Sequence, residues 1–436
     1  KIAWYEHIQD VTAPAAPTGL ATTTELTNIT LTWNANSESD LDHYNIYGGT
    51  STSPTTLVAT VSAGTETYTH ALLDAGQTYY YRISASDDAG NESDPTADVS
   101  ATVSSDYTVV PDDNFEQALI DLGYDDTLDD HVLTASISGV TDLDVSGKEI
   151  SDLTGIEDFT ALNTLYCGNN NLTSLDVNNN TALTHLHCYN NQLTSLDLSA
   201  NTALIGLWIY DNSLTSLDVT SNTALGNLAC DGNQLTSLDV SNNTALHTLS
   251  GSSNQWTNLD LSNTTSLTGL WISGNQLTSL DLSNNTALDG MNCSSNQLTS
   301  LDVSSNTALT FMNCDGNQLT SLDVSNNTSL TVLSCYGNGL TSLDVSANTA
   351  LTTLDCSGNQ LTSLDVSNNT LLTYLNCDNN EFTNLDVSAN TNLTDLLCQY
   401  NQLTSLDLSS NTALRQLHCF TNQLTTLDVS NNTALT

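Results

Sequence analysis

Ten cysteines are the most reactive side chains of the sequence, and they recur at multiples of 21 residues. Thiols in such a series could pair as disulfides, hold a metal ion or fill a hydrophobic core. If the repeats stack as parallel strands, neighbouring Cβ atoms stay ~4.8 Å apart, whereas a disulfide needs ~3.8 Å. Ligands in a straight line also cannot surround a tetrahedral metal. We therefore expect buried, reduced thiols in leucine-like positions at Cys167, Cys188, Cys230, Cys293, Cys314, Cys335, Cys356, Cys377, Cys398 and Cys419.

Aromatic side chains mark a second place where this spacing could support chemistry. Tyr166, His187 and Trp208 lie 21 residues apart, as do Tyr189 and Tyr210, so stacked repeats would align them in two columns. Exposed columns of flat ring faces with polar edges could bind a sugar or a protein, or they could stack for stability alone. The candidate ligand-binding residues are Tyr166, His185, His187, Tyr189, Trp208, Tyr210 and Trp271.

Three groups of side chains could bind cations. His185 and His187 lie on one face of an expected strand, with Asp211 as the nearest further ligand. Thirteen aspartates from Asp176 to Asp428 repeat every 21 residues, and their repulsion could be offset by hydrogen bonds, by divalent cations or by contact with a mineral or ice surface. An acidic run could bind calcium as a cofactor, or it could form a solvated loop. Its carboxylates are Asp125, Asp126, Asp129 and Asp130.

The composition excludes several classes of function. Among 436 residues, 49 are acidic and 4 are Lys or Arg, which gives a formal net charge of −45. Such a surface repels nucleic acids and anionic membranes, and no run of apolar residues is long enough to insert into a bilayer. The sequence has no glycine-rich phosphate loop, His-Glu-x-x-His motif or nucleophile elbow. We therefore expect no catalytic residues and no enzyme activity.

Four segments are expected along the chain. Residues 1–12 form a lead-in, and residues 13–104 contain short alternating strands between turn residues, which is typical of an antiparallel sandwich. Residues 105–161 contain an amphipathic helix at 113–123, with a capping residue and a terminal glycine, followed by degenerate repeats. We interpret them as the cap that a solenoid needs at its end. Residues 162–436 hold thirteen units of 21 residues.

Two family resemblances rest on these residues. The first block resembles a fibronectin type III domain, because Trp33 lies on an early core strand and Leu73, Gly76 and Tyr79 match its tyrosine corner. The 21-residue unit has two Leu-x-x-Leu spacings and an asparagine such as Asn359, and it resembles the nested bacterial leucine-rich repeats called IRREKO. The resemblance implies a mainly β protein, a fibronectin type III sandwich followed by a capped leucine-rich-repeat solenoid, outside or on the surface of a bacterium.

Two finer predictions concern the interior of the solenoid. The Asn359 amide should bind turning backbone that no strand reaches. Gly251 occupies a cysteine position, and Trp256 stands where other repeats have leucine. We expect the Trp256 indole to fill the space that Gly251 leaves.

The expected function is non-catalytic binding or adhesion to an extracellular glycan or protein, through the variable strand face of the repeats. One alternative is a targeting arm of a larger secreted enzyme that degrades carbohydrate or protein, and another is a structural stalk without a ligand. The start at Lys1 without an apolar leader suggests a processed chain, and the end at Thr436 inside a repeat suggests a further C-terminal domain.

Overall fold

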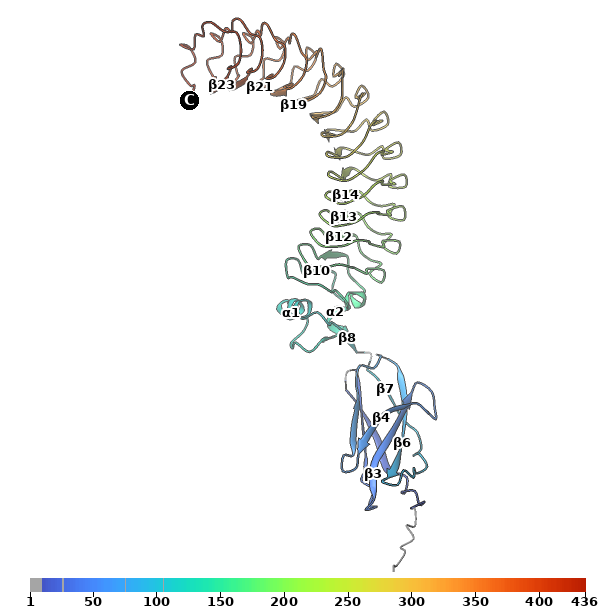
Figure 1. The fold of residues 1–436 in the computed structure, drawn as a ribbon. Coiled ribbons are helices and arrows are strands. Elements are labelled where there is room, and N and C mark those ends of the chain that lie inside the picture. The colour runs from blue at the N-terminus through green and yellow to red at the C-terminus, as the bar shows by residue number, and fades with distance from the viewer. Residues whose placement is uncertain (1–9, 26, 75, 105) are drawn as a thin grey trace, which may run out of the picture. The chain divides into compact units, whose positions relative to one another are not determined.

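A computed structural model gives the fold as two compact units. The residues that it describes are 10–25, 27–74, 76–104 and 106–436, so the first nine residues of the expected lead-in lie outside the described residues. The first unit comprises Lys1–Val109 with His131–Ala135, and the second comprises Val110–Asp130 with Ser136–Thr436. The protein is mainly β: small antiparallel sheets come first and a parallel solenoid follows (Figure 1).

The first unit is a sandwich of two antiparallel sheets. One has the order β1 (Thr18–Glu25), β2 (Asn28–Asn34), β5 (Thr67–His70), and the other the order β4 (Leu57–Ser62), β3 (Leu41–Gly49), β6 (Thr78–Asp87), β7 (Val99–Thr102). In the core, the Trp33 ring meets Tyr44 edge-on with centroids 5.3 Å apart. The Tyr79 hydroxyl accepts a hydrogen bond from the Asp74 backbone N–H at 3.3 Å, as in a tyrosine corner. These features confirm the predicted antiparallel sandwich, and they agree with its resemblance to a fibronectin type III domain.

A helical cap covers the first repeats of the second unit. Helix α1 (Asp113–Leu122) starts where the Asp112 carboxylate accepts hydrogen bonds from two backbone N–H groups, and it ends at Gly123, whose φ of 80° suits a glycine. Its buried Phe115 lies 6.3 Å from Phe159, which follows the short helix η1 (Ile156–Asp158). The remaining short elements are α2 (Thr134–Ile137) and the antiparallel pair β8 (Tyr107–Val109) and β9 (His131–Leu133).

The contacts place β8 and β9 in the first unit, although the sequence suggested a single block over residues 105–161. The order of the elements nevertheless follows the predicted series of sandwich, cap and repeats. The four expected boundaries therefore stay predictions.

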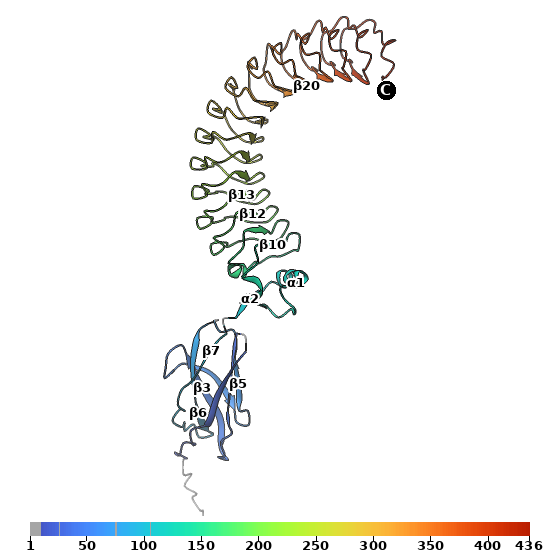
Figure 2. The same cartoon turned by 180° about the vertical axis from the view of Figure 1, so that it is seen from behind.

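The solenoid is a parallel sheet of 14 three-residue strands in chain order. β10 (Asp142–Asp144) is the degenerate first strand, and from β11 onward residues 21 apart lie opposite each other. Both views show the strands along the concave side of the solenoid (Figures 1 and 2). The strands are β11 (Thr164–Tyr166), β12 (His185–His187), β13 (Gly206–Trp208), β14 (Asn227–Ala229), β15 (Thr248–Ser250), β16 (Gly269–Trp271), β17 (Gly290–Asn292), β18 (Phe311–Asn313), β19 (Val332–Ser334), β20 (Thr353–Asp355), β21 (Tyr374–Asn376), β22 (Asp395–Leu397) and β23 (Gln416–His418).

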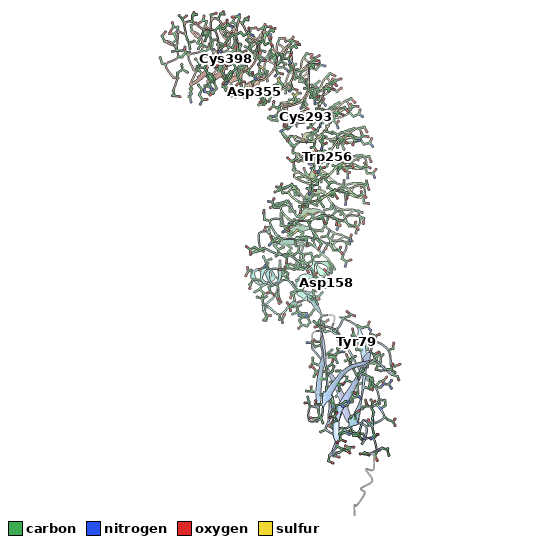
Figure 3. All side chains as sticks on the ribbon, viewed as in Figure 1. Tyr79, Asp158, Trp256, Cys293, Asp355 and Cys398 are labelled. Atoms are coloured by element: carbon green, nitrogen blue, oxygen red, sulfur yellow. The ribbon has the colours of Figure 1, made fainter. Side chains whose placement is uncertain are left out.

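The interior of the solenoid confirms the predicted cysteine column. All ten cysteines are free, nine are buried and Cys419 is partly exposed. Burial raises the pKa of the Cys167 thiol to about 12, so this thiol stays protonated and unreactive. At the exceptional repeat, a Cβ added to Gly251 would lie 2.0 Å from Cη2 of Trp256, which is fully buried (Figure 3). The indole thus fills the predicted space.

Two series of buried asparagines hold the turns. The Asn359 Nδ2 donates to the carbonyls of Cys335, Cys356 and Ser357 at 3.0–3.1 Å, and its Oδ1 accepts from the Leu340 N–H at 3.0 Å. This confirms the predicted role of the Asn359 amide. A second series, which the sequence analysis missed, is typified by Asn348, whose Nδ2 donates to two backbone carbonyls of preceding repeats at 2.9 Å.

Candidate functional site

Two columns of stacked rings lie on the strand side of the first repeats. The His187 ring stacks between Tyr166, at a centroid distance of 4.5 Å, and Trp208, at 4.1 Å with an interplanar angle of 3°. Beside them Tyr189 and Tyr210 stack at 4.6 Å and 6°. The predicted alignment is confirmed, and we call these five residues the aromatic ladder.

Two glycines make room for the ladder. A Cβ on Gly206 would lie 2.4 Å from Cζ3 of Trp208, and a Cβ on Gly168 would lie 2.7 Å from Cζ of Tyr189. Neither glycine has a positive φ, so backbone conformation does not demand them. Ring space is therefore what these two positions provide.

The stacking corrects one part of the expected chemistry. The centroid distances are close to the strand spacing of ~4.8 Å, so the rings face each other along the solenoid. Ring faces inside the columns are covered, and mainly ring edges point to solvent; the expectation of free flat faces is wrong there. A face of Trp208 is less covered, because its partner on β14 is the small Ala229.

The imidazoles of β12 are part of this stack and do not form a metal site. Burial lowers the pKa of His187, and His185 lowers it further while Asp144 raises it, so His187 is neutral near pH 7. Thr184 Oγ1 lies 3.0 Å from Nδ1 of His185. Within the described part of the chain, His185, His187 and Asp211 do not come together as a group of potential ligands.

Trp271 lies away from the aromatic ladder. It repeats the Gly-Leu-Trp sequence of β13, but its ring is tilted at 49° to Phe311, with centroids 5.7 Å apart. Ala229 and Ser250 separate Trp208 from Trp271 in the same register. The structure thus assembles the first six predicted ligand-binding residues and leaves Trp271 in a separate place.

The carboxylates of the predicted calcium site do not converge. Burial raises the pKa of Asp125, and Glu116, Asp129 and Asp126 raise it further. Even so, Asp125, Asp126, Asp129 and Asp130 do not bring three ligand atoms within 4.8 Å of one another. Over residues 10–25, 27–74, 76–104 and 106–436, the group that does so is one that no sequence pattern indicated: Asp10, Asp40 and Asp87 of the sandwich.

The thirteen-aspartate column is held by local hydrogen bonds. Typically, Asp323 Oδ1 accepts from the Ser325 N–H at 2.9 Å, and the hydrogen bonds of Ser325 lower the pKa of Asp323. Asp218 accepts in the same way from Thr220, through both its N–H and its hydroxyl. These contacts favour hydrogen bonding as what offsets the repulsion between the aspartates. Cation or mineral binding by the column stays a prediction.

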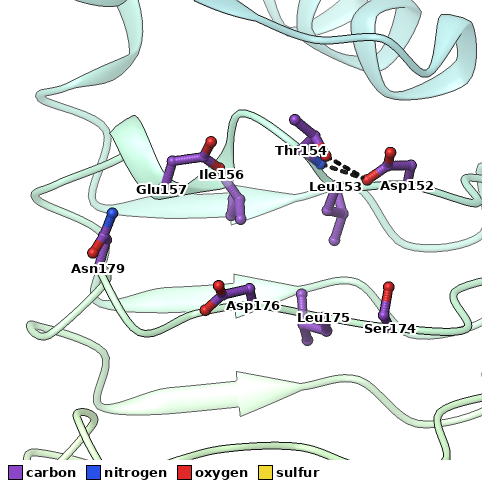
Figure 4. Close-up of a pocket in the computed structure, with 9 residues that line it drawn as sticks. All are labelled: Asp152, Leu153, Thr154, Ile156, Glu157, Ser174, Leu175, Asp176 and Asn179. Atoms are coloured by element: carbon purple, nitrogen blue, oxygen red, sulfur yellow. Dashed lines mark hydrogen bonds between the residues drawn. The ribbon is translucent and has the colours of Figure 1, made fainter.

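An open groove lies between the cap and the first full repeat (Figure 4). Asp152 accepts two hydrogen bonds of 2.8 Å from Thr154, and Glu157 accepts one from the Gly155 N–H. With Asp176 these carboxylates make the groove acidic, but they do not form a group of potential metal ligands among the described residues.

Comparison with solved structures identifies the solenoid. The chain is 40% identical to the functional domain of InlJ from Listeria monocytogenes, which includes a cysteine ladder, with a TM-score of 0.72 over 76% of this chain and 74% of that one. It is 23% identical to the internalin InlF of L. monocytogenes, with a TM-score of 0.64 over 75% of this chain and 95% of that one. It is also 23% identical to a leucine-rich-repeat protein of Leptospira interrogans, with a TM-score of 0.61 over 69% of this chain and 90% of that one. The last two show the fold alone.

Two curated enzymes share a shorter stretch. Exoglucanase B of Cellulomonas fimi is 40% identical over 104 residues, which is 23% of this chain and 9% of the enzyme. A poly(3-hydroxybutyrate) depolymerase of Ralstonia pickettii is 40% identical over 97 residues, 22% of this chain and 18% of the enzyme. The chain therefore spans less than a fifth of these relatives, and their activities do not carry over.

No family model matches the chain. Among the described helices, none is both long and apolar enough to cross a bilayer. The 21-residue spacing of this chain, its buried cysteine column and its similarity to InlJ lead to one conclusion. The chain belongs to the bacterial leucine-rich-repeat proteins of the InlJ type.

Proposed function

We propose that the chain is a non-catalytic binding protein at or outside a bacterial surface, and that its aromatic ladder contacts a protein ligand. The observation that carries this proposal is the ladder itself, with Gly206 and Gly168 leaving space for its rings. The fold does not need these rings, since the same strand positions hold Ala229 and Ser250 in later repeats.

A protein fits this surface better than a glycan does. A sugar ring stacks on an aromatic face, and the faces inside both columns are covered by neighbouring rings. The exposed edges instead offer tyrosine hydroxyls and imidazole nitrogens beside apolar carbon, and tyrosine and tryptophan are enriched at protein hot spots. Trp208 is half-buried, so a ligand could desolvate it fully at little cost in side-chain entropy.

A second candidate function also uses the aromatic ladder for binding, but gives the whole chain a different role. It is a targeting arm that brings a secreted polymer-degrading enzyme to its substrate. The observation in its favour is the stretch of about one hundred residues that is 40% identical to parts of an exoglucanase and of a polyester depolymerase. The same proposal places the repeats in the nested IRREKO class, because each unit has two Leu-x-x-Leu spacings.

One binding experiment separates these candidates. The full chain, Trp208→Ala and Tyr400→Ala are applied to purified extracellular proteins, a glycan array, cellulose and poly(3-hydroxybutyrate) particles. Tyr400 is the matched control, since it is 52% exposed and lies on a later repeat. We expect binding to at least one protein that Trp208→Ala weakens at least about tenfold and Tyr400→Ala leaves unchanged.

Other outcomes have definite meanings. Protein binding that survives Trp208→Ala contradicts the role of the ladder. Binding to cellulose or the polyester alone favours the targeting arm, and binding to glycans alone contradicts the choice of a protein ligand.

A further inference from the structure

A second distinctive surface lies on the strand side of repeats far from the aromatic ladder. Tyr374 on β21 pairs directly with Asp395 on β22, and Asp355 is the last residue of β20 (Figure 3). Asp315 and Asp378 follow the inward cysteines of their own repeats, and all five side chains are half-buried. We call Asp315, Asp355, Tyr374, Asp378 and Asp395 the acidic strand patch.

The patch carboxylates accept hydrogen bonds, but among the described residues none is paired with a cationic side chain. Burial raises the pKa of Asp315 and of Asp378, and in both cases the Asp355 carboxylate raises it further. Burial also raises the pKa of Tyr374, as do Asp355, Asp378 and Asp395. The ion pairs of the described residues join His43 to Asp42 and Lys148 to Asp121, so these patch carboxylates have no cationic partner there.

A buried acceptor beside Asp378 also lacks a donor. Gln399 is only 6% exposed, and its Nε2 donates to Asp378 Oδ2 at 2.5 Å. Its Oε1 has no hydrogen-bond partner among the residues that the structure describes. Leaving such an acceptor unpaired is costly, and it belongs to the amide that already binds Asp378.

The spacing of the carboxylates decides what kind of cation fits. No three of them bring ligand atoms within 4.8 Å of one another, which argues against a single metal ion among these described residues. Asp315, Asp355 and Asp378 come from the repeats of β18, β20 and β21, so at ~4.8 Å per strand they spread over roughly 15 Å. The steps between them are thus about 9.6 Å and about 4.8 Å, and three alternate side chains of an extended peptide, ~7 Å apart, span the same total length.

Arginine suits this row better than lysine. Its planar guanidinium has five N–H donors and can bind a carboxylate such as Asp378 through two of them, and it stacks on aromatic rings such as Tyr374. We propose that the acidic strand patch binds an extended, arginine-rich segment of a protein partner. This site is separate from the aromatic ladder and does not depend on it.

The probe is a fluorescent peptide of about twelve residues that alternates Arg and Ser, measured by anisotropy with the full chain at about 150 mM salt. The test variant is Asp315→Asn/Asp378→Asn. Asparagine keeps an acceptor for the Ser334 hydroxyl and the Tyr336 N–H, which now bind Asp315. The control is Asp323→Asn/Asp386→Asn, which removes the same charge from turns of the same two repeats.

We expect the patch variant to weaken peptide binding about tenfold and the turn control to weaken it less than about twofold. Trp208→Ala should bind the peptide like the wild type, which keeps this test independent of the proposed ladder function. If both double variants lose the same affinity for the peptide, binding reflects the general attraction of an acidic chain for a cationic peptide. That result would overturn the proposal. Undetectable binding to the wild type also overturns it.

Folding is checked by thermal melting of each variant. If Asp315→Asn disturbs the fold, Asp378→Asn alone serves, because Asp378 accepts from a side chain and not from the backbone. A well-folded Asp378→Asn that binds the peptide as tightly as the wild type contradicts the proposal.

Discussion

Asp315 and Asp323 belong to one repeat, but their carboxylates experience opposite environments. Asp323 lies in the exposed turn, where hydrogen bonds from Ser325 lower its pKa. Asp315 lies on the strand side, where burial raises its pKa in spite of hydrogen bonds of 2.7 Å from Ser334 and Tyr336. The turn stabilises its charge within a few residues, whereas the strand side leaves charge partly desolvated.

The difference explains which positions repeat and which vary. A turn aspartate satisfies its own backbone, so the same solution works in every unit and the sequence repeats it. Outward strand positions bind backbone in only some repeats, as Asn313 and Asp355 do. In successive repeats they also hold Trp208, Ala229 and Ser250. Variation on that side is therefore the place to look for recognition, and both proposed surfaces lie there.

Both sides of the solenoid rest on an equivalent core only if the Trp256 indole fills the space at Gly251. Gly251→Cys should lower the free energy of unfolding by about 3 kcal/mol, because its Cβ would lie 2.0 Å from the indole. Gly251→Cys/Trp256→Leu restores the usual pair and should recover most of the loss. Urea unfolding followed by circular dichroism measures both. A single variant as stable as the wild type would mean that the indole does not fill this space.

The two Gly-Leu-Trp strands provide a matched pair within the strand side. Gly206→Ala should cost about 1–2 kcal/mol, because the new Cβ meets the Trp208 ring at 2.4 Å. Gly269→Ala is the matched control, since its Cβ would lie 3.4 Å from Nε1 of Trp271, and it should cost less than about 0.5 kcal/mol. Denaturation midpoints and tryptophan fluorescence report both changes. Equal effects would show that ring space is not what Gly206 provides.

Periodic contacts are what the sequence predicted well. Each repeat touches its neighbours, so a spacing of 21 residues was enough to place Cys356, the Asn359 amide and the Trp256 indole. The columns of the aromatic ladder followed from the same spacing. Ring orientation did not, because it depends on side-chain torsions that a repeat length does not determine.

Contacts between residues that the repeat spacing does not relate could not be predicted from the sequence. Asp10, Asp40 and Asp87 come together only through the sandwich topology, and no local pattern marks them. In the acidic strand patch, the environment of Asp378 could not be predicted either, because its burial and its contact with Gln399 depend on neighbouring side chains. The second asparagine series did leave a signal, an Asn-Thr pair in nearly every turn, such as Asn348-Thr349.

The smallest expected effect tests the opposite pKa shifts directly. A raised pKa means that the folded state binds the proton more tightly than the unfolded chain, so acidification through that range favours folding. A lowered pKa has the reverse consequence: stability that is present at neutral pH is lost as the pH falls below about 4. Asp315→Asn should therefore melt about 1–2 °C above the wild type at neutral pH, and this gain should shrink as the pH falls toward about 4.

Asp323→Asn is the matched variant in the turn of the same repeat. It removes a charge that the fold favours, so it should melt no higher than the wild type at neutral pH, and any deficit should close in acid. Scanning calorimetry of both variants across this pH range measures the two differences side by side. Shifts of the same sign at neutral pH would mean that overall acidity governs both carboxylates, because a purely global repulsion is relieved equally by either substitution. Melting shifts of opposite sign would mean that the burial of Asp315 causes the difference between the two carboxylates.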